Sequence, residues 1–119
     1  MEMKHWPVEL RVVADKSSLE IRFDSGEAMS LSAELLRVES PSAEVQGHGA
    51  DQKTTPPGKQ NVKIASLSPV GNYAVKIAFD DGHDTGLFSW DLLHDYGTRQ
   101  TALIDDYLAR LAAEGRTRS

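Results

Sequence analysis

The stretch that decides the fold is residues 73–90, which read YAVKIAFDDGHDTGLFSW. Its first seven residues alternate large apolar side chains with small or charged ones, as in a half-buried β-strand. Asp81-Gly82 follows as a favoured two-residue hairpin turn, because glycine adopts a positive φ without a Cβ clash. Such a turn would gather the large apolar residues of both strands on one face, whereas a slip of one residue would scatter them. The expected pairs are Tyr73 with Trp90, Val75 with Phe88 and Ile77 with Gly86.

A second hairpin is expected near the start of the chain. The alternation predicts strands at residues 8–13, 19–23 and 28–31. A two-residue loop at Ser25-Gly26 would place Ile21 opposite Ser30. We favour a three-residue loop, residues 25–27, because its register puts the apolar residues on one face. That register pairs Phe23 with Met29 and Ile21 with Leu31.

Short helices are expected after each hairpin. Ser32 is a good N-cap for residues 33–37, and Ser89 for residues 90–96, which Gly97 would close. Thr98 opens a last helix that ends at Gly115, and residues 116–119 are expected to form a frayed tail. This helix has one apolar stripe, which we expect to pack on the sheet. The stripe consists of Ile104, Tyr107, Leu108 and Leu111.

The middle of the chain predicts a long connection. Residues 40–60 are rich in Gly, Pro, Ser and Thr and read as a loop, and loops of this length are often functional. A strand at residues 62–67 follows, broken by residues 68–71. The fold class expected is therefore α+β: small antiparallel β-sheets built from hairpins, with short helices and one C-terminal helix packed on the sheet. Residues 1–119 form one domain, with its core at about 8–114.

The two hairpins resemble each other in sequence. Residues 23–36 and 79–93 both read as strand, Asp-containing glycine turn, strand, serine cap and short helix. Either hairpins and caps reuse the same few residue types, or a strand-turn-strand-helix unit was duplicated. In both cases the two turns should be built alike, with His83 where the first hairpin has Glu27.

Composition excludes several classes of protein. The 119 residues fit one domain, and the absence of cysteine rules out disulfides, thiol nucleophiles and cysteine-bound metal clusters. A net charge of −5 argues against nucleic acid as a partner. No stretch is apolar enough for a membrane span, and the polar start is unlike a signal peptide, so we expect a cytoplasmic protein.

Two separated motifs resemble one family. Residues 71–93 closely resemble the signature of gamma-butyrobetaine hydroxylase-like N-terminal domains, and residues 36–42 resemble its other signature. Residues 44–49 resemble the small standalone bacterial members. The resemblance spans roughly residues 8–100, and the two motifs occur in the family's order.

The resemblance implies a domain without oxygenase chemistry of its own. In the carnitine-synthesis dioxygenases this domain precedes the catalytic domain and holds zinc with three cysteines and one histidine. The histidine matches His83, and the cysteines match Ser40, Ser42 and Val45. Serine is a poor neutral zinc ligand and valine is none, so the family's structural zinc site is not expected here.

The leading functional hypothesis is a non-catalytic interaction module. A domain similar to this family follows the ATPase in some Fe–S carrier proteins of the Mrp type, so such a carrier is the expected partner. The long loop and the rim of the second hairpin would form the interface. No catalytic set is found: there is no G-x-S-x-G motif and no phosphate-binding loop, which leaves a small enzyme as the least favoured reading.

The alternative is a metal-binding domain for zinc or iron. Its candidate ligands are His83 and His48, because imidazole binds these metals well, with nearby carboxylates completing the shell. The purely structural interpretation is that His83 is a turn histidine that hydrogen-bonds the long loop and that His48 is a surface histidine. His5 and His94 have no supporting pattern. Lys53, Lys59 and Lys63 form a modest basic cluster, read as a solvated surface or as a contact for an acidic partner.

Overall fold

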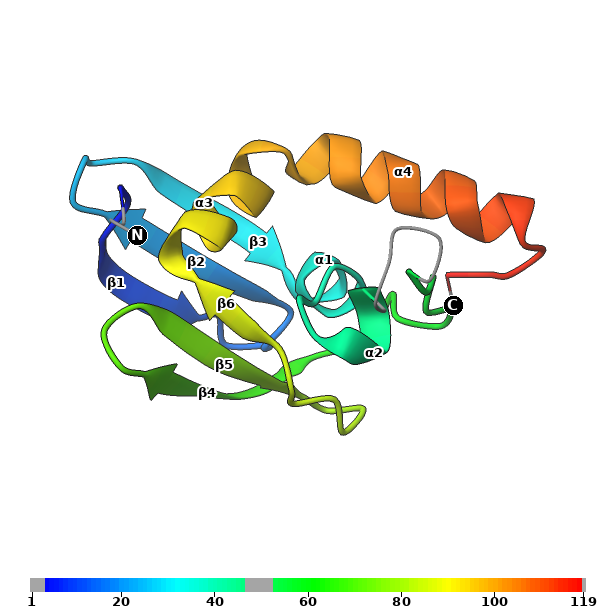
Figure 1. Ribbon diagram of the computed structural model, residues 1–119, viewed down its shortest axis with the longest axis horizontal. Helices are drawn as coiled ribbons and strands as arrows, with labels where there is room; N and C mark the ends of the chain where they lie inside the picture. The colour runs from blue at the N-terminus through cyan, green and yellow to red at the C-terminus, as the bar shows by residue number, and fades with distance from the viewer. Residues whose placement is uncertain (1–3, 47–52, 119) are drawn as a thin grey trace.

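The computed structural model describes residues 4–46 and 53–118 and confirms the α+β class (Figure 1). Two antiparallel three-stranded sheets contain all the strands of these residues, in the orders β1-β2-β3 and β4-β5-β6. The strands are β1 Pro7–Val12, β2 Ser18–Phe23, β3 Ala28–Ser32, β4 Ile64–Val70, β5 Ala74–Phe79 and β6 Leu87–Ser89. The helices are α1 Ala33–Val38, α2 Ala43–Gln46, α3 Trp90–Thr98 and α4 Gln100–Ala113.

The main core lies between the two sheets and the helices that follow them. It joins the buried side chains of β2, β3, β5 and β6 to those of α1 and α3. Helix α4 begins beside the edge strand β3, where the Gln100 side chain bonds the backbone of Ser30 and Ser32, and then extends past the end of that strand. Farther along α4, Tyr107 and Leu111 pack on Val38 of α1 as a smaller cluster. The expected packing of the C-terminal helix on the sheet is therefore confirmed, with α1 as a second support.

The register of the first hairpin is shifted from the one predicted. Its loop does contain three residues, but these are residues 24–26 and not 25–27. The reason is Gly26, whose φ of +94° fits the left-handed position that closes such a loop. Because the shift is two residues, the same apolar side chains still share one face. The observed pairs are Leu19 with Leu31 and Ile21 with Met29.

The second hairpin has the predicted register but a different turn. Val75 pairs with Phe88, as expected. The loop, however, is the three-residue segment 80–82 and not Asp81-Gly82 alone. The extra residue is absorbed by residues 83–86, which are not paired as a strand. Tyr73, which was predicted to join the apolar face, lies just before β5 and is 46% exposed.

The two turns are built alike, as the sequence similarity predicted. In each, a phenylalanine N–H donates to the carbonyl four residues on, Phe23 to Glu27 and Phe79 to His83, both at 2.8 Å. Gly26 and Gly82 have φ values of +94° and +92°. Each unit ends at a serine N-cap: the Ser32 hydroxyl accepts from the N–H of Leu35, and that of Ser89 from the N–H of Leu92. Both predicted caps are confirmed.

Gly97 does not close α3 as predicted, because the helix continues to Thr98. Glycine is needed there for space. A Cβ on Gly97 would lie 2.0 Å from the sulfur of Met29 in β3. The glycine therefore lets α3 pack closely on the first sheet.

The described parts of the long connection, residues 40–46 and 53–60, contain more regular structure than the sequence predicted. It contains α2, whose Val45 is buried, and β4 continues through Pro69 to Val70 instead of breaking at residue 68. Proline is tolerated there because β4 is an edge strand. The end of the chain is also held: Thr117 and Arg118 carbonyls accept N–H bonds from Gly58 and Gln60. The prediction of a frayed tail is thus wrong for residues 116–118.

Candidate functional site

His83 lies directly after the second hairpin turn and reaches the segment between α1 and α2. Its Nε2 is 3.0 Å from the Ser40 hydroxyl and 3.2 Å from that of Ser42. The two hydroxyls are 3.2 Å apart, so the three groups form one hydrogen-bonded cluster. Ser40 and Ser42 are buried, at 0% and 5% exposure. The cluster is therefore a polar contact between the hairpin and the connection, with buried serines and a half-buried histidine.

Gly86 makes this close approach possible. A Cβ at this position would lie 2.3 Å from the Ser40 hydroxyl oxygen, 3.1 Å from Phe88 and 3.3 Å from Pro41. Any larger residue would push residues 83–86, which lie between the turn and β6, away from Ser40. The glycine is required here for packing.

The residues matched to the family's zinc ligands are thus close together without being a zinc set. His83, Ser40 and Ser42 meet, and Val45 is buried in the adjacent α2. Serine hydroxyls are neutral and weak ligands, and here they serve as hydrogen-bond partners of the imidazole. His48, the second candidate ligand, lies outside the described residues.

Asp81 in the same turn pairs with two positively charged side chains, Arg37 and Lys59. Its Oδ2 accepts from Arg37 Nε at 2.7 Å and from Lys59 Nζ at 2.6 Å, and its Oδ1 accepts from the His83 N–H at 3.1 Å. Desolvation by itself would raise the pKa of Asp81. The hydrogen bonds from Lys59, His83 and Arg37 outweigh it and lower this pKa to about 2. Asp81 therefore ties the hairpin tip to α1 and to the connection.

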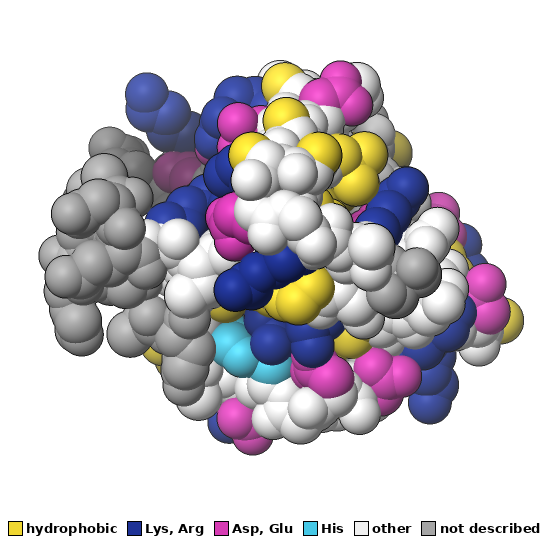
Figure 2. Space-filling view, turned by 90° about the vertical axis from the view of Figure 1, so that its right-hand side faces the viewer, with side chains coloured by type: hydrophobic (Ala, Val, Ile, Leu, Met, Phe, Trp, Pro, Cys, Tyr) yellow, Lys and Arg dark blue, Asp and Glu magenta, His cyan; other side chains and the backbone are white. Residues whose placement is uncertain are grey.

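Further ion pairs surround this end of the molecule, where Lys and Arg side chains alternate with acidic ones (Figure 2). Glu39 is buried and pairs with Lys53 at 2.8 Å and Arg110 at 3.1 Å. Buried Glu34 pairs with Arg118 at 2.8 Å. Two of the three lysines of the predicted basic cluster, Lys53 and Lys59, are therefore neutralised by acids of the fold and are not a free surface charge.

A second polar cluster lies beside the first hairpin turn, and the sequence patterns did not indicate it. His94 Nε2 lies 3.0 Å from Glu27 Oε2, and the His94 ring stacks on the His5 ring with centroids 3.6 Å apart. His5 Nδ1 lies 2.9 Å from Asp91 Oδ1. The one signal that could have found it was the likeness of the two hairpins, because Glu27 occupies the position of His83.

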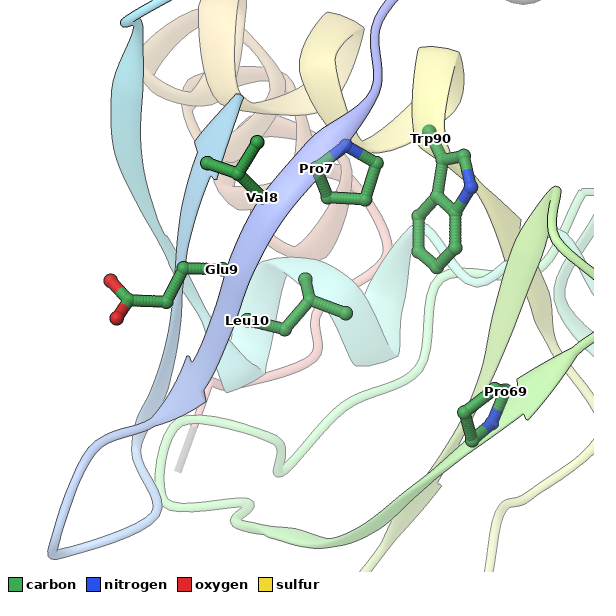
Figure 3. Close-up of a pocket in the computed structure, with 6 residues that line it drawn as sticks. All are labelled: Pro7, Val8, Glu9, Leu10, Pro69 and Trp90. Atoms are coloured by element: carbon green, nitrogen blue, oxygen red, sulfur yellow. The ribbon is translucent and has the colours of Figure 1, made fainter. Parts of the chain in front are cut away.

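An open pocket of about 260 Å³ lies between the edge strands of the two sheets (Figure 3). Leu10 of β1 points toward the side where the Trp90 ring and Pro69 lie, whereas Glu9 points to the opposite side. Val8 on the rim is 54% exposed. The full lining consists of Pro7, Val8, Glu9, Leu10, Pro69 and Trp90.

The lining of the pocket is better suited to apolar contact with a bound group than to catalysis. Glu9 is the one titratable side chain in its lining, so no acid–base or nucleophilic pair meets there. No helix in the described part of the chain is long and apolar enough to cross a membrane.

Comparison with known proteins gives a family and no activity. Residues 10–94 match the model of a family described as gamma-butyrobetaine hydroxylase-like, N-terminal. No curated protein matches the chain.

Solved structures share the fold over most of the chain. One NMR solution structure is 44% identical, with a TM-score of 0.83, covering 97% of this chain and 90% of the other. A second NMR structure is 48% identical, with a TM-score of 0.82, covering 99% and 90%. A crystal structure of a DUF971 family protein of unknown function from Acidithiobacillus ferrooxidans is 37% identical, with a TM-score of 0.59, covering 73% and 86%.

Proposed function

Because this chain belongs to the gamma-butyrobetaine hydroxylase-like N-terminal domain family, we propose that it is a non-catalytic module that binds a protein partner. The observation that carries the proposal is the open apolar pocket between β1 and β4. We place this binding in the cytoplasm.

The occupant we propose is an extended segment of the partner. Strands β1 and β4 are edges of their sheets, and an edge strand leaves backbone N–H and C=O groups available to an added strand. Pro69 has no N–H to donate, so the added strand would pair with β1. One apolar side chain of that segment would enter the pocket beside Trp90.

The rim of the second hairpin and the long connection are less suitable than the pocket as an interface for a protein partner. Their cations Arg37 and Lys59 bind Asp81, and Lys53 binds Glu39. A partner would have to break these internal pairs before using the charges. An apolar pocket has no such pairs to break, so it is the better interface.

The partner class to test first is an Fe–S carrier ATPase of the Mrp type, because a similar domain follows the ATPase in some of those proteins. Calorimetry with the purified ATPase should show saturable binding. We expect Val8→Asp to weaken it at least about tenfold, since a charge at the pocket rim loses solvation on contact. Val8 is 54% exposed, so the variant should fold.

The matched control is Leu87→Asp, which adds the same charge at another exposed apolar residue, 45% exposed, in β6. It should bind as the wild type does. Equal loss in both variants, or no binding by the wild type, would count against the proposal. Loss only in Lys59→Glu would move the interface to the hairpin rim.

A second candidate function is metal binding at His83. The observation in its favour is the convergence of His83, Ser40 and Ser42 within 3.2 Å. Metal analysis of untagged protein tests it, and zinc or iron present in wild type but lost in His83→Ala would support it. The same metal content in both proteins would exclude His83 as its ligand.

A further inference from the structure

Three side chains able to bind a metal ion converge beside the first hairpin turn: His5, Glu27 and His94. One potential ligand atom from each lies within 4.8 Å of those of the other two. Within residues 4–46 and 53–118, no other group of three His, Cys, Asp or Glu side chains converges in this way. The three ligands come from distant segments: the residues before β1, the start of the β2–β3 return and helix α3.

A fourth side chain orients this group. Asp91 Oδ1 lies 2.9 Å from Nδ1 of the His5 ring and also accepts the backbone N–H of His5 at 3.0 Å. An ionised carboxylate only accepts hydrogen bonds, so it selects the tautomer of His5 with the proton on Nδ1. The other ring nitrogen, Nε2, then carries the lone pair that a metal needs. Carboxylates hold metal-binding histidines in this manner as outer-shell partners.

The charges suit a cation. The hydrogen bond from His94 lowers the pKa of Glu27, so this carboxylate is ionised at neutral pH. Desolvation by itself would raise the pKa of Asp91, but hydrogen bonds from His5 and from the Lys4 backbone outweigh it, so the pKa of Asp91 is lowered as well. The side chains of His5 and His94 are 29% and 16% exposed, so an ion could enter from solvent.

We propose that His5, Glu27 and His94 bind one divalent transition-metal cation of the Zn²⁺ class, with Asp91 as the outer-shell partner of His5. A set of two imidazoles and one carboxylate binds borderline cations such as Zn²⁺ in preference to Mg²⁺ or Ca²⁺. Tetrahedral zinc with bonds of 2.0–2.1 Å places its ligand atoms about 3.3 Å apart. The ligand atoms lie within 4.8 Å of one another, so each pair would close by at most about 1.5 Å. The stacked rings of His5 and His94 would tilt apart to bring the ion into the plane of each ring.

The bound ion would join the chain start, the first turn and α3. This site is distinct from the cluster of His83, Ser40 and Ser42 at the other turn, and the two can be tested separately.

The test is a Zn²⁺ titration of untagged, full-length protein, followed by NMR of the imidazole nitrogens. We expect one equivalent to shift the ring signals of His5 and His94 and to leave those of His83 unchanged. The melting temperature should rise with Zn²⁺ concentration, because the ion binds the folded state.

Glu27→Gln is the decisive variant, because it removes the charged ligand at a side chain that is 53% exposed and keeps its size. We expect it to weaken Zn²⁺ binding at least about tenfold, and Asp91→Asn to weaken it by about tenfold through His5. The matched control is Glu20→Gln, the same change at a carboxylate of β2 that is 42% exposed and pairs with Arg11, and it should leave the affinity unchanged.

The proposal is overturned if excess Zn²⁺ produces no saturable shifts at His5 and His94. It is equally overturned if Glu27→Gln binds Zn²⁺ as the wild type does, or if the His83 signals alone respond. Since Glu27→Gln does not touch the core, unfolding cannot mimic these results.

Discussion

The two hairpin units share a turn and a helix cap but differ in length by one residue. Five residues separate Gly26 from the capping Ser32, and six separate Gly82 from Ser89. In the first unit the return strand β3 begins at Ala28, next to the turn. In the second unit β6 begins only at Leu87, so residues 83–86 remain outside the ladder.

That one residue changes what each hairpin can contact. In the first hairpin the two strands pair directly after the turn, and Glu27 lies at the surface beside His94. The second hairpin has four residues, 83–86, between the turn and β6, and His83 and Gly86 of this segment reach the buried Ser40. The same turn is thus used once to complete a sheet and once to hold the α1–α2 connection against a sheet.

Gly86→Ala should disrupt this difference most strongly. The added methyl would lie 2.3 Å from the Ser40 hydroxyl, so Ser40 would have to leave His83 or the segment would have to move. We expect a loss of about 2–3 kcal/mol in the free energy of unfolding, the upper part of the range for overpacking. Urea denaturation measures it.

Ser30→Ala is the control, because Ser30 is an exposed residue of the return strand in the first hairpin. It should change stability by less than about 0.5 kcal/mol. Adding Ser40→Gly to Gly86→Ala should recover part of the loss, since it removes the clashing hydroxyl. Wild-type stability in Gly86→Ala alone would show that the approach to Ser40 is not a constraint.

Asp81 makes the stability of the second hairpin turn depend on pH through its bonds to Arg37 and Lys59. Its pKa falls from 3.8 to about 2 on folding, so the ionised form stabilises the fold at pH values above about 4. Because Asp81 is partly exposed, solvent screening reduces this contribution to about 1–2 kcal/mol at neutral pH, and it is lost as the pH falls from about 4 to about 2. Asp81→Asn should be less stable than wild type by about that amount at pH 7 and should approach it at low pH.

Asp24→Asn makes the same change in the first turn. Among the described residues no Lys or Arg side chain pairs with Asp24, so this variant should keep nearly the wild-type stability at neutral pH. Chemical denaturation at several pH values compares the three proteins. Parallel profiles for wild type and Asp81→Asn would mean that Arg37 and Lys59 do not bind Asp81 in solution.

The sequence was sufficient for whatever depends on alternation and on turn or cap chemistry. Strands, both serine caps and the Val75–Phe88 pairing follow from local patterns, and these are confirmed. The loop of the second turn was predicted one residue too short, because nothing local shows that residues 83–86 absorb the extra residue. That depends on Ser40, more than forty residues earlier in the chain.

The candidate sites were harder to predict for the same reason. His83 was identified by its motif. Its contact with Ser40 and Ser42 agrees with the purely structural interpretation, in which this histidine hydrogen-bonds the long loop. The cluster of His5, Glu27 and His94 was missed because its members lie in three distant segments. Only tertiary packing brings them together, and no spacing in the sequence encodes it.

The smallest expected effect tests whether the two turns are truly equivalent. Gly26→Ala and Gly82→Ala each place a Cβ at a φ above +90°, with no other atom within 4 Å, so only the backbone conformation is penalised. We expect each to cost about 1 kcal/mol, the usual cost of a left-handed non-glycine residue. Urea denaturation of both variants gives the comparison. Because the turns have the same hydrogen bonds, equal losses would show that the units differ only after the turn. A clearly larger loss at Gly82 would mean that the turn itself is coupled to the Asp81 and His83 contacts, and that the extra residue alone does not explain the difference.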